Sequence, residues 1–268
     1  MKGKELEKIA NSYIRSLEKY CKRVPGSFSI EDIHDLRVDY KRLRAFIRLC
    51  LEEKHTQHLQ IPNELRDVYK AAGAVRDCQL FIAKITLFAQ VQYAIPEFTK
   101  CLQQQLFREK ENLVSKIEKV SWNKVRKSVK DELPPVLYDV AIRQFVNRKV
   151  SGIHILMLAA EREEDLHSAR KNMKDLLHGA RIFDHDLAVP FPFPAWKEEK
   201  PVHDMAEKLG DFNDECLTLS FLDSKCLENI PAEELQHIAS WRNMQAQQVD
   251  IAKRQLLQEI QKVQLLNQ

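Results

Sequence analysis

The segment IHDLRVDYKRLRAFIRLC, residues 33–50, decides the fold of this chain, because a second segment has the same pattern. A shift of about 133 residues superimposes LHSARKNMKDLLHGAR, residues 166–181, on it, and a long-period match of this kind indicates a duplicated structural unit. The matched pairs are His34 and His167, Arg37 and Arg170, Lys41 and Lys174, Leu43 and Leu176, and Arg48 and Arg181. We therefore expect two related halves.

A second pair of matched segments follows the first pair. AAGAVRDCQL, residues 71–80, aligns with KLGDFNDECL, residues 208–217, at a slightly larger shift. The matched residues are Gly73 and Gly210, Asp77 and Asp214, and Leu80 and Leu217. We expect a single domain over residues 1–268, with one four-helix repeat at about 4–120 and another at about 135–268.

The composition favours an all-α globular protein. Of 268 residues, 44% are hydrophobic and 30% are charged, and only 6 glycines can mark turns. No window approaches the roughly 18 apolar residues of a membrane span, so we expect a cytoplasmic protein without a membrane partner. The scattered cysteines lack a CxxC pair, which indicates packing thiols. The net charge of +3 is small, so any preference for a polyanion must come from local arrangement.

Apolar periodicity and helix-breaking residues predict eight helices. They are expected at residues 4–23, 30–53, about 63–92, 96–119, 135–150, 162–184, about 202–227 and 232–266. Residues 24–26 are expected to form a turn, and Ser29 to be the N-cap of the second helix. Residues 121–135 are poorly patterned and are expected to be a connection. Residues 188–201 contain four prolines and are expected to be a loop.

A helical projection places the cations of residues 33–50 on one narrow stripe. At about 100° per residue, Arg37, Lys41, Arg44 and Arg48 fall within about 60° of one another, beside His34. We call this group the cationic stripe. Apolar side chains flank it on both sides, which is typical of a groove wall rather than a solvated face. The residues expected to face elsewhere are Asp35, Asp39 and Arg42.

The corresponding helix of the second half carries a similar set of cations. Arg170, Lys174 and Arg181 share one face, and Lys171 and His178 broaden it. Packed face to face, the two sets would concentrate positive charge in a groove of low dielectric constant, where repulsion costs stability unless an anion fills it. Arginine forks and mobile lysines together suit the repeated phosphates of a linear polyanion.

These segments resemble the signature regions of a known family. HDLRVDYKRLRAFIRL with GAVRD, and LHSARKNMKDLLHGAR with LGDFND, are similar to the two signature regions of the CHAD family, the conserved histidine α-helical domain. The resemblance covers nearly the whole chain. It implies two pseudo-symmetric four-helix bundles around a basic cavity that binds inorganic polyphosphate, with no catalysis, metal or cofactor. The implied ligand residues are His34, Arg37, Lys41, Arg44, Arg48, His167, Arg170, Lys171, Lys174 and Arg181.

Two residues depart from the family's pattern, and others are expected to have minor roles. Asp175 and Leu177 stand where further basic residues are usual, so the second half is expected to bind more weakly. Asp77 and Asp214 are expected to orient nearby cations from behind the ligand residues. Each matched histidine is expected to combine a capping or core contact with a phosphate contact. Additional candidates are Arg42, His178, Arg15, Lys19, Lys22 and Arg143, of which the last four are expected by default to be solvated.

Two metal-dependent alternatives remain open. Glu31 and His34, like Glu164 and His167, have the Glu-x-x-His spacing of carboxylate-bridged di-iron bundles. An arginine and a lysine follow each histidine, and these cations would repel a metal ion. The residues considered for a metal phosphohydrolase are His34 and Asp35 with Asp184, His185 and Asp186, or with His203 and Asp204.

Nucleic-acid binding is another alternative, because the same cations could contact the phosphates of a single strand or of RNA. Base readout or stacking needs aromatic, Asn or Gln side chains among the cations, and the cationic stripe contains none. A narrow groove favours a slim phosphate chain without bases. The sequence therefore predicts a non-enzymatic polyphosphate-binding protein, with association with polyphosphate granules as its expected location.

Overall fold

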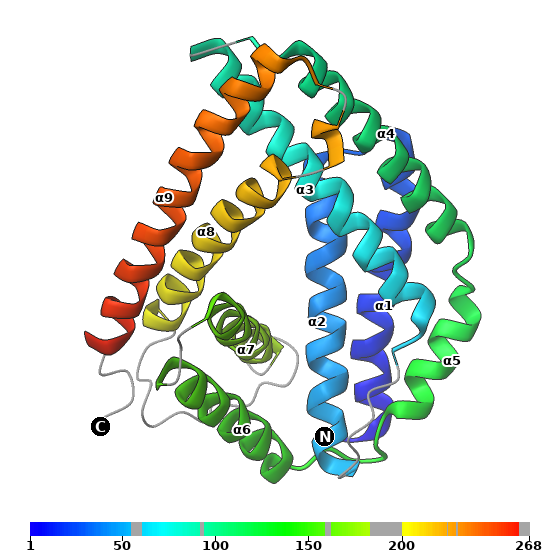
Figure 1. Cartoon of the computed structure of the whole chain (residues 1–268). Helices are drawn as coiled ribbons and strands as arrows, with labels where there is room; N and C mark the ends of the chain where they lie inside the picture. Colours follow the sequence, from blue (N-terminus) through cyan, green and yellow to red (C-terminus); the bar gives the residue numbers. More distant parts are fainter. Residues whose placement is uncertain are drawn as a thin grey trace.

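The computed structural model describes residues 1–54, 61–91, 94–158, 162–182, 200–223, 225–228 and 230–262. Across these ranges the chain forms nine α-helices (Figure 1). They are α1 (Gly3–Ser27), α2 (Ile30–Lys54), α3 (Asn63–Val91), α4 (Pro96–Glu118), α5 (Trp122–Glu132), α6 (Asp139–Leu158), α7 (Glu163–Arg181), α8 (Lys200–Leu222) and α9 (Ala232–Lys262). A short 3₁₀ helix, η2 (Lys225–Leu227), precedes α9.

The expected all-α fold is confirmed. No strand occurs in the described ranges, where one isolated β-bridge pairs Lys2 with Val136. None of the helices in those ranges is long and apolar enough to cross a membrane.

The break between α1 and α2 differs from the expected one. α1 continues through Pro25 to Ser27, so the turn expected at residues 24–26 is wrong. The chain turns instead at Phe28, whose φ is 48° and whose N–H donates to the Val24 carbonyl at 2.8 Å. Pro25 has no N–H to donate to the carbonyl of Cys21, so α1 lacks one backbone hydrogen bond near its end. Ser29 then caps α2 as expected, since its Oγ accepts a hydrogen bond from the Asp32 N–H at 3.0 Å.

α5 occupies a stretch that was expected to be a connection, and that expectation is wrong. Val125 and Val129 lie one helical turn apart and are each 1% exposed. α5 packs them against α1 and α2. Two buried positions in a stretch rich in cations are too few to show a helical period in the sequence. The described residues therefore hold nine helices instead of eight.

Other helix ends move by several residues. α6 begins at Asp139 and ends at Leu158, whereas the sequence predicted 135–150. The residues just before α6 pair with the amino-terminal segment, and the Leu137 N–H donates to the Met1 carbonyl at 2.9 Å. α8 begins at Lys200, so the last two residues of the expected loop 188–201 are helical. The rest of that loop lies outside the described residues.

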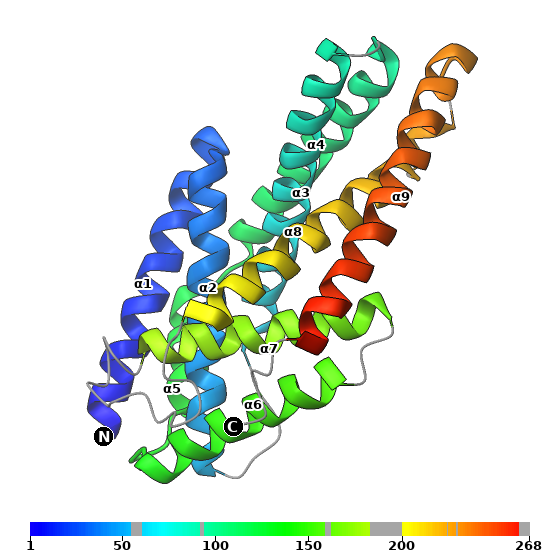
Figure 2. The same ribbon diagram turned by 90° about the vertical axis from the view of Figure 1, so that its left-hand side faces the viewer.

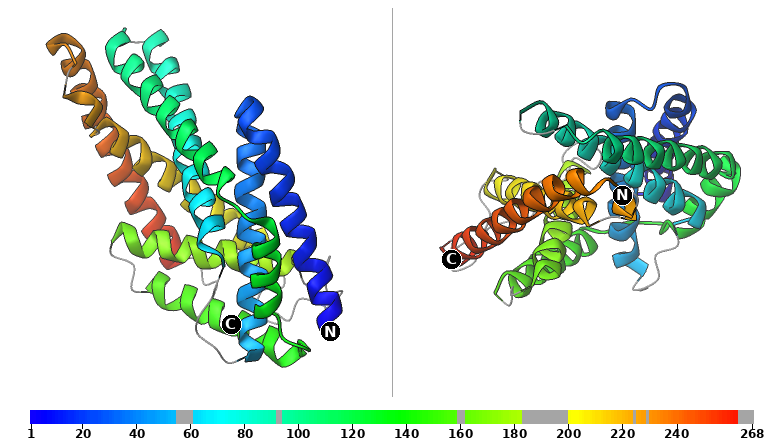
Figure 3. Two further views of the ribbon diagram at one scale, coloured as in Figure 1. Left: turned by 90° about the vertical axis from the view of Figure 1, so that its right-hand side faces the viewer. Right: turned by 45° about the horizontal axis from the view of Figure 1, so that its top comes forward.

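α2 lies at the centre of the molecule. It packs against α1, α3 and α5, and also against α6 and α7 from the second half of the chain. Figures 2 and 3 show α7 crossing α2. Buried apolar residues lie on both sides of the cationic stripe of α2. One side has Leu36, Tyr40, Leu43 and Ile47, and the other has Ala45 and Leu49. The expectation that apolar side chains flank the cationic stripe on both sides is thus confirmed.

A second hydrophobic cluster joins the ends of α3 and α4 to those of α8 and α9. The ends of α3, α4 and α9 meet at the top of Figure 1, and α8 ends below them. Phe81 stacks on Phe221 with 4.7 Å between ring centroids, and Phe88 stacks on Trp241 at 4.2 Å. Aromatic pairs of this kind add about 0.5–1.5 kcal/mol beyond the burial of their area. The two halves of the chain therefore meet at this cluster as well as at the α2–α7 crossing.

Candidate functional site

A cavity of about 680 Å³ lies between α1, α2, α7 and α8, and we call it the interhelical cavity. Its lining residues are Ser12, Tyr13, Ser16 and Tyr20 of α1, His34, Asp35, Val38, Asp39, Lys41 and Arg42 of α2, Arg170, Lys174, Leu177 and His178 of α7, and His203 of α8. Basic side chains from both matched helices, α2 and α7, therefore meet around one space.

Lys41 occupies a strongly cationic environment in this cavity. Burial first, and then the charges of Arg37 and Arg170, lower the pKa of Lys41 from 10.5 to about 8. No hydrogen bond or ion pair holds its ammonium group within the described part of the chain. An anion in the cavity would relieve the repulsion and raise the pKa again.

Arg170 approaches the cavity from α7. Its Nε is buried and has no hydrogen-bond partner among the described residues. The same Nε lies 3.6 Å from the place that a Cβ on Gly210 would occupy, which is an ordinary contact distance. A buried donor without a partner costs roughly 1–3 kcal/mol. Arg170 therefore keeps hydrogen-bonding capacity that no described residue uses.

The cavity also contains two carboxylates. Asp35, Asp39 and Arg42 all line it, so the expectation that these residues face away from the groove is wrong. Arg42 was also considered as an additional ligand, and its place in the cavity is compatible with that role. Asp39 accepts hydrogen bonds from Ser16 and, at 3.0 Å, from Arg42. Asp35 accepts one from the Tyr20 hydroxyl at 3.0 Å. The face of α2 that lines the cavity is thus not the face of Arg37, Arg44 and Arg48. It lies closer to α1, which supplies the hydroxyl groups of Ser16 and Tyr20.

Arg37 packs against α3 instead of lining the interhelical cavity. Its guanidinium carbon lies 5.0 Å from the centroid of the Tyr69 ring, a cation–π geometry. A Cβ on Gly73 would stand 2.0 Å from Nη1 of Arg37, so a larger residue at position 73 would have to displace this guanidinium group. Each glycine thus faces one of the matched arginines, Arg37 or Arg170, but only the contact at Gly73 is closer than a Cβ allows.

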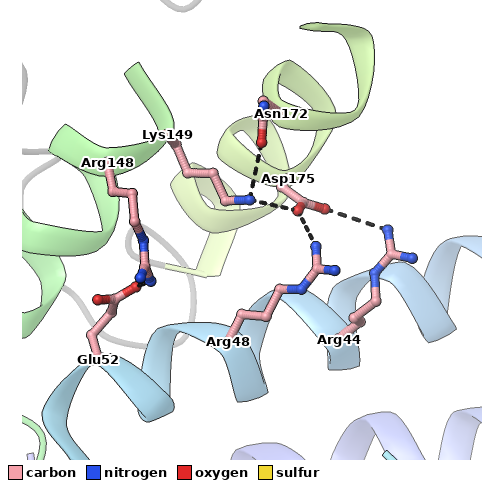
Figure 4. A network of polar contacts seen from close by, with 7 residues as sticks. All are labelled: Arg44, Arg48, Glu52, Arg148, Lys149, Asn172 and Asp175. Carbon is pink, nitrogen blue, oxygen red and sulfur yellow. Dashed lines mark hydrogen bonds and ion pairs between the residues drawn. The ribbon is translucent and has the colours of Figure 1, made fainter. Parts of the chain in front are cut away.

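Arg44 and Arg48 are held by Asp175 of α7 and do not line the interhelical cavity (Figure 4). Arg44 Nη2 lies 3.4 Å from one oxygen of Asp175, and Arg48 pairs with the other oxygen. Lys149 of α6 also contacts this carboxylate, at 2.9 Å. Burial alone would raise the pKa of the Asp175 carboxyl, but the charges of Lys149, Arg48 and Arg44 outweigh burial and lower it. Asp175 is therefore an ionised link between α2, α6 and α7.

The sequence model of the CHAD domain matches residues 8–223 of the chain. The chain belongs to the CHAD domain family. Two solved structures are similar to this CHAD domain. One is the CHAD domain from the plant Ricinus communis, with 14% identity, a TM-score of 0.65, and coverage of 97% of this chain and 87% of that one. The other is PptA from Streptomyces chartreusis, with 9% identity, a TM-score of 0.69, and coverage of 97% and 99%. A comparison with curated proteins found no match.

The two matched histidines of this CHAD domain have different surroundings. His34 lines the interhelical cavity, and burial together with the charge of Arg76 lowers its pKa. His167 does not line the cavity. Its Nδ1 lies 3.0 Å from Asn213 Oδ1 of α8, and burial together with the charge of Lys171 lowers its pKa. The repeat therefore matches in sequence but not in the contacts of its histidines.

Asp77 and Asp214 line a smaller cavity of about 230 Å³ between α3 and α8. The pKa of Asp77 is raised, mainly by burial and further by the charge of Asp214, although the charge of Arg37 acts in the opposite direction. The two matched aspartates thus face one space where the halves of the CHAD domain meet. Their expected role in orienting cations stays a prediction, and the electrostatic attraction between Asp77 and Arg37 is compatible with it.

Several residues near the site gave no clear signal in the sequence. Arg76 was missed, although its charge acts on His34 and Asp77 and its Nη1 is buried without a described partner. Lys149, the third cation on Asp175, was also missed. The hydroxyl-bearing residues of α1 recur every four positions, a spacing that places them on one helical face and could have identified them. They are Ser12, Ser16 and Tyr20.

The remaining candidates from the sequence lie away from the interhelical cavity or cannot be placed in it. Those with exposed side chains are Arg15, Lys19, Arg143 and Lys171. Lys22 is exposed as well and pairs with Glu18 at 2.9 Å. The side chain of Arg181 lies outside the described part of the structure.

Few of the residues considered for a metal site come together in the described ranges. One group of three close ligand atoms occurs there, on a single turn of α8, and consists of His203, Asp204 and Glu207. His203 lines the interhelical cavity together with His34 and Asp35, so the structure does bring these parts of the considered phosphohydrolase site near one another. Residues 184–186 lie outside the described residues.

Proposed function

We propose that this CHAD domain binds inorganic polyphosphate in the interhelical cavity, without catalysis and without a resident metal or cofactor. The observation that carries the proposal is the meeting of Lys41 with Arg170 and Lys174 around one cavity. The lowered pKa of Lys41, about 8, reflects burial and the repulsion among these cations. A polyanion would offset that repulsion in a site of low dielectric constant, where each charge interaction is stronger than in water.

The acidic lining residues indicate where the phosphates would lie. Asp35 and Asp39 are held on the α1 side of the cavity by Tyr20 and Ser16. Phosphate oxygens placed there would meet like charge. The phosphate chain is therefore expected on the other side, between Lys41 of α2 and the cations of α7.

A phosphate chain without bases fits this cavity better than a nucleic acid. Tyr13 and Tyr20 supply aromatic rings on which a base could stack, and single-stranded nucleic acid is our second candidate for that reason. The Tyr13 ring already has an aromatic neighbour, however, and Tyr20 lies beside a carboxylate that would repel the phosphates of a nucleic acid. Tyr20 donates to Asp35, and Tyr13 lies 6.4 Å from Phe46 between ring centroids.

The proposal is tested by removing two cations of the cavity. Lys41→Ala combined with Lys174→Ala is expected to weaken polyphosphate binding at least about a hundredfold, because each charge-assisted contact contributes roughly 1.5–3 kcal/mol. The helical circular dichroism spectrum should be unchanged. Isothermal titration calorimetry measures the affinity.

The matched control removes two cations from another surface. Lys124 and Lys127 are exposed on α5, so Lys124→Ala with Lys127→Ala changes the net charge equally. Binding by this control variant should stay close to that of the unmodified protein. Equal weakening by both pairs would show that only net charge matters and would contradict a specific cavity. A location at polyphosphate granules in the cytoplasm follows from the proposed ligand.

A further inference from the structure

The cationic stripe of α2 is divided into an open part and a closed part. Lys41 lines the interhelical cavity, whereas Arg44 and Arg48 contact Asp175. At about 1.5 Å per residue, Arg48 lies roughly 10 Å beyond Lys41 along the helix axis. The division therefore removes a substantial length of cationic surface from the cavity.

Asp175 occupies the position that an anionic ligand group would take at the closed part. Its two oxygens contact Arg44 and Arg48 separately, and Lys149 approaches from α6 (Figure 4). One carboxylate thus faces three cations, so the cluster keeps an excess of positive charge. Asp175 itself is 3% exposed and is fixed by the packing of α7.

The two arginines are nevertheless not sealed from solvent. The side chain of Arg44 is 22% exposed and that of Arg48 is 36% exposed. The Nε of Arg44 is buried and has no hydrogen-bond partner among the described residues. Both guanidinium groups could therefore turn to a ligand if Asp175 did not hold them.

We propose that Asp175 acts as a built-in anion that closes the far end of the cationic stripe and limits the site to a short run of phosphates. This inference rests on the proposed function, and it assigns a specificity-determining role to Asp175. Affinity should rise with chain length only until the interhelical cavity is filled. Longer chains gain nothing further, because the next two arginines already contact the carboxylate of Asp175.

A purely structural role for Asp175 makes a different prediction. If the carboxylate only links α2, α6 and α7, its removal lowers stability and leaves the dependence of affinity on chain length unchanged. If it also closes the site, its removal adds a new binding surface. A gain in affinity that grows with chain length separates the two roles.

The test compares the unmodified protein with Asp175→Asn, which preserves shape and removes the charge. Affinities are measured by calorimetry for tripolyphosphate and for size-fractionated longer chains. Each affinity is divided by the number of positions along the chain at which the site can bind. In the unmodified protein the affinity should level off among the shorter chains. In Asp175→Asn the affinity for longer chains should increase about tenfold relative to that for tripolyphosphate, because two arginine forks become available.

The matched control is Glu52→Gln. Glu52 lies one turn beyond Arg48 on α2 and pairs with Arg148 of α6, so the substitution removes one negative charge nearby without freeing Arg44 or Arg48 (Figure 4). Glu52→Gln should leave the ratio of the affinity for long chains to the affinity for tripolyphosphate unchanged.

Three results would overturn the inference. The first is an equal ratio of long-chain to tripolyphosphate affinity in Asp175→Asn and the unmodified protein. The second is the same increase of this ratio in Glu52→Gln. The third is an affinity of the unmodified protein that keeps rising over all chain lengths. The last measurement needs no variant, so it decides the matter even if Asp175→Asn does not fold. Absence of any polyphosphate binding by the unmodified protein would instead refute the proposed function itself, and this inference with it.

Discussion

The guanidinium group of Arg37 covers Gly73 so closely that a Cβ at this glycine would stand 2.0 Å from Nη1. The matched pair in the second half is looser, since a Cβ on Gly210 would lie 3.6 Å from the nearest atoms of Arg170. The same two residue types thus meet in both halves, with tight contact in one and ordinary contact in the other. This difference leads to a first prediction.

Gly73→Ala is expected to displace the guanidinium group of Arg37 from its place over Tyr69. The lost cation–π contact costs about 0.5–2 kcal/mol, and the higher helix propensity of alanine offsets part of that cost. Gly210→Ala should be neutral or stabilising by about 0.5–1 kcal/mol, since alanine fits there and favours a helix. Urea denaturation measures both. In an Arg37→Ala background the cost of Gly73→Ala should largely disappear, and a cost that persists would show that Arg37 is not its cause.

A second prediction concerns the pH dependence of binding. The pKa of Lys41 is about 8 in the folded protein, compared with 10.5 for an unperturbed lysine. A bound polyanion favours the charged ammonium and raises this pKa, so binding takes up a proton when the pH is above about 8. Polyphosphate affinity should therefore fall as the pH rises through 8.

Calorimetry in buffers with different ionisation enthalpies measures this proton uptake. Lys41→Arg is the control, because arginine stays charged throughout the range. The variant should lose most of the decline in affinity above pH 8. An identical decline in the variant and the unmodified protein would show that another group is responsible.

A third prediction concerns stability in acid. The pKa of Asp175 is lowered below the ordinary 3.8, so its charge contributes stability that is fully present above pH 3.8. This contribution is lost as the pH falls through the pKa of the folded state. Asp175→Asn leaves three cations without their shared partner and should cost about 3–5 kcal/mol near neutral pH.

The difference in free energy of unfolding between Asp175→Asn and the unmodified protein should then become progressively smaller below pH 3.8. Chemical denaturation as a function of pH measures it in both proteins. A difference that stays constant down to the acid transition would show that the cost arises from packing rather than from charge.

The sequence predicted the helices that carry the site but not their rotation about their own axes. The match of His34, Arg37 and Lys41 with the second half identified α2 and α7 correctly as the matched helices. Apolar side chains flank the cationic stripe on both sides, so the sequence pattern did not indicate which face of α2 lines the cavity. The contact of Arg37 with Tyr69 fixes the rotation, together with the Asp175 contacts of the neighbouring arginines.

Other features could not be predicted because they depend on contacts between distant segments. Asp175 interrupts a basic pattern and was expected only to weaken binding, since its partner Lys149 lies on another helix. The helix α5 was missed because its two buried valines give too short a pattern. Arg76 was missed because its position relative to His34 depends on the packing of α3 beside α2.

The central claim is tested most directly by titrating the unmodified protein with long-chain polyphosphate and with a single-stranded oligonucleotide of equal charge, with and without a chelator. The account predicts that polyphosphate binds more tightly than the oligonucleotide, that binding weakens as salt is added, and that the chelator has no effect. Equal affinity for the two polyanions, or loss of polyphosphate binding in the chelator, would contradict it.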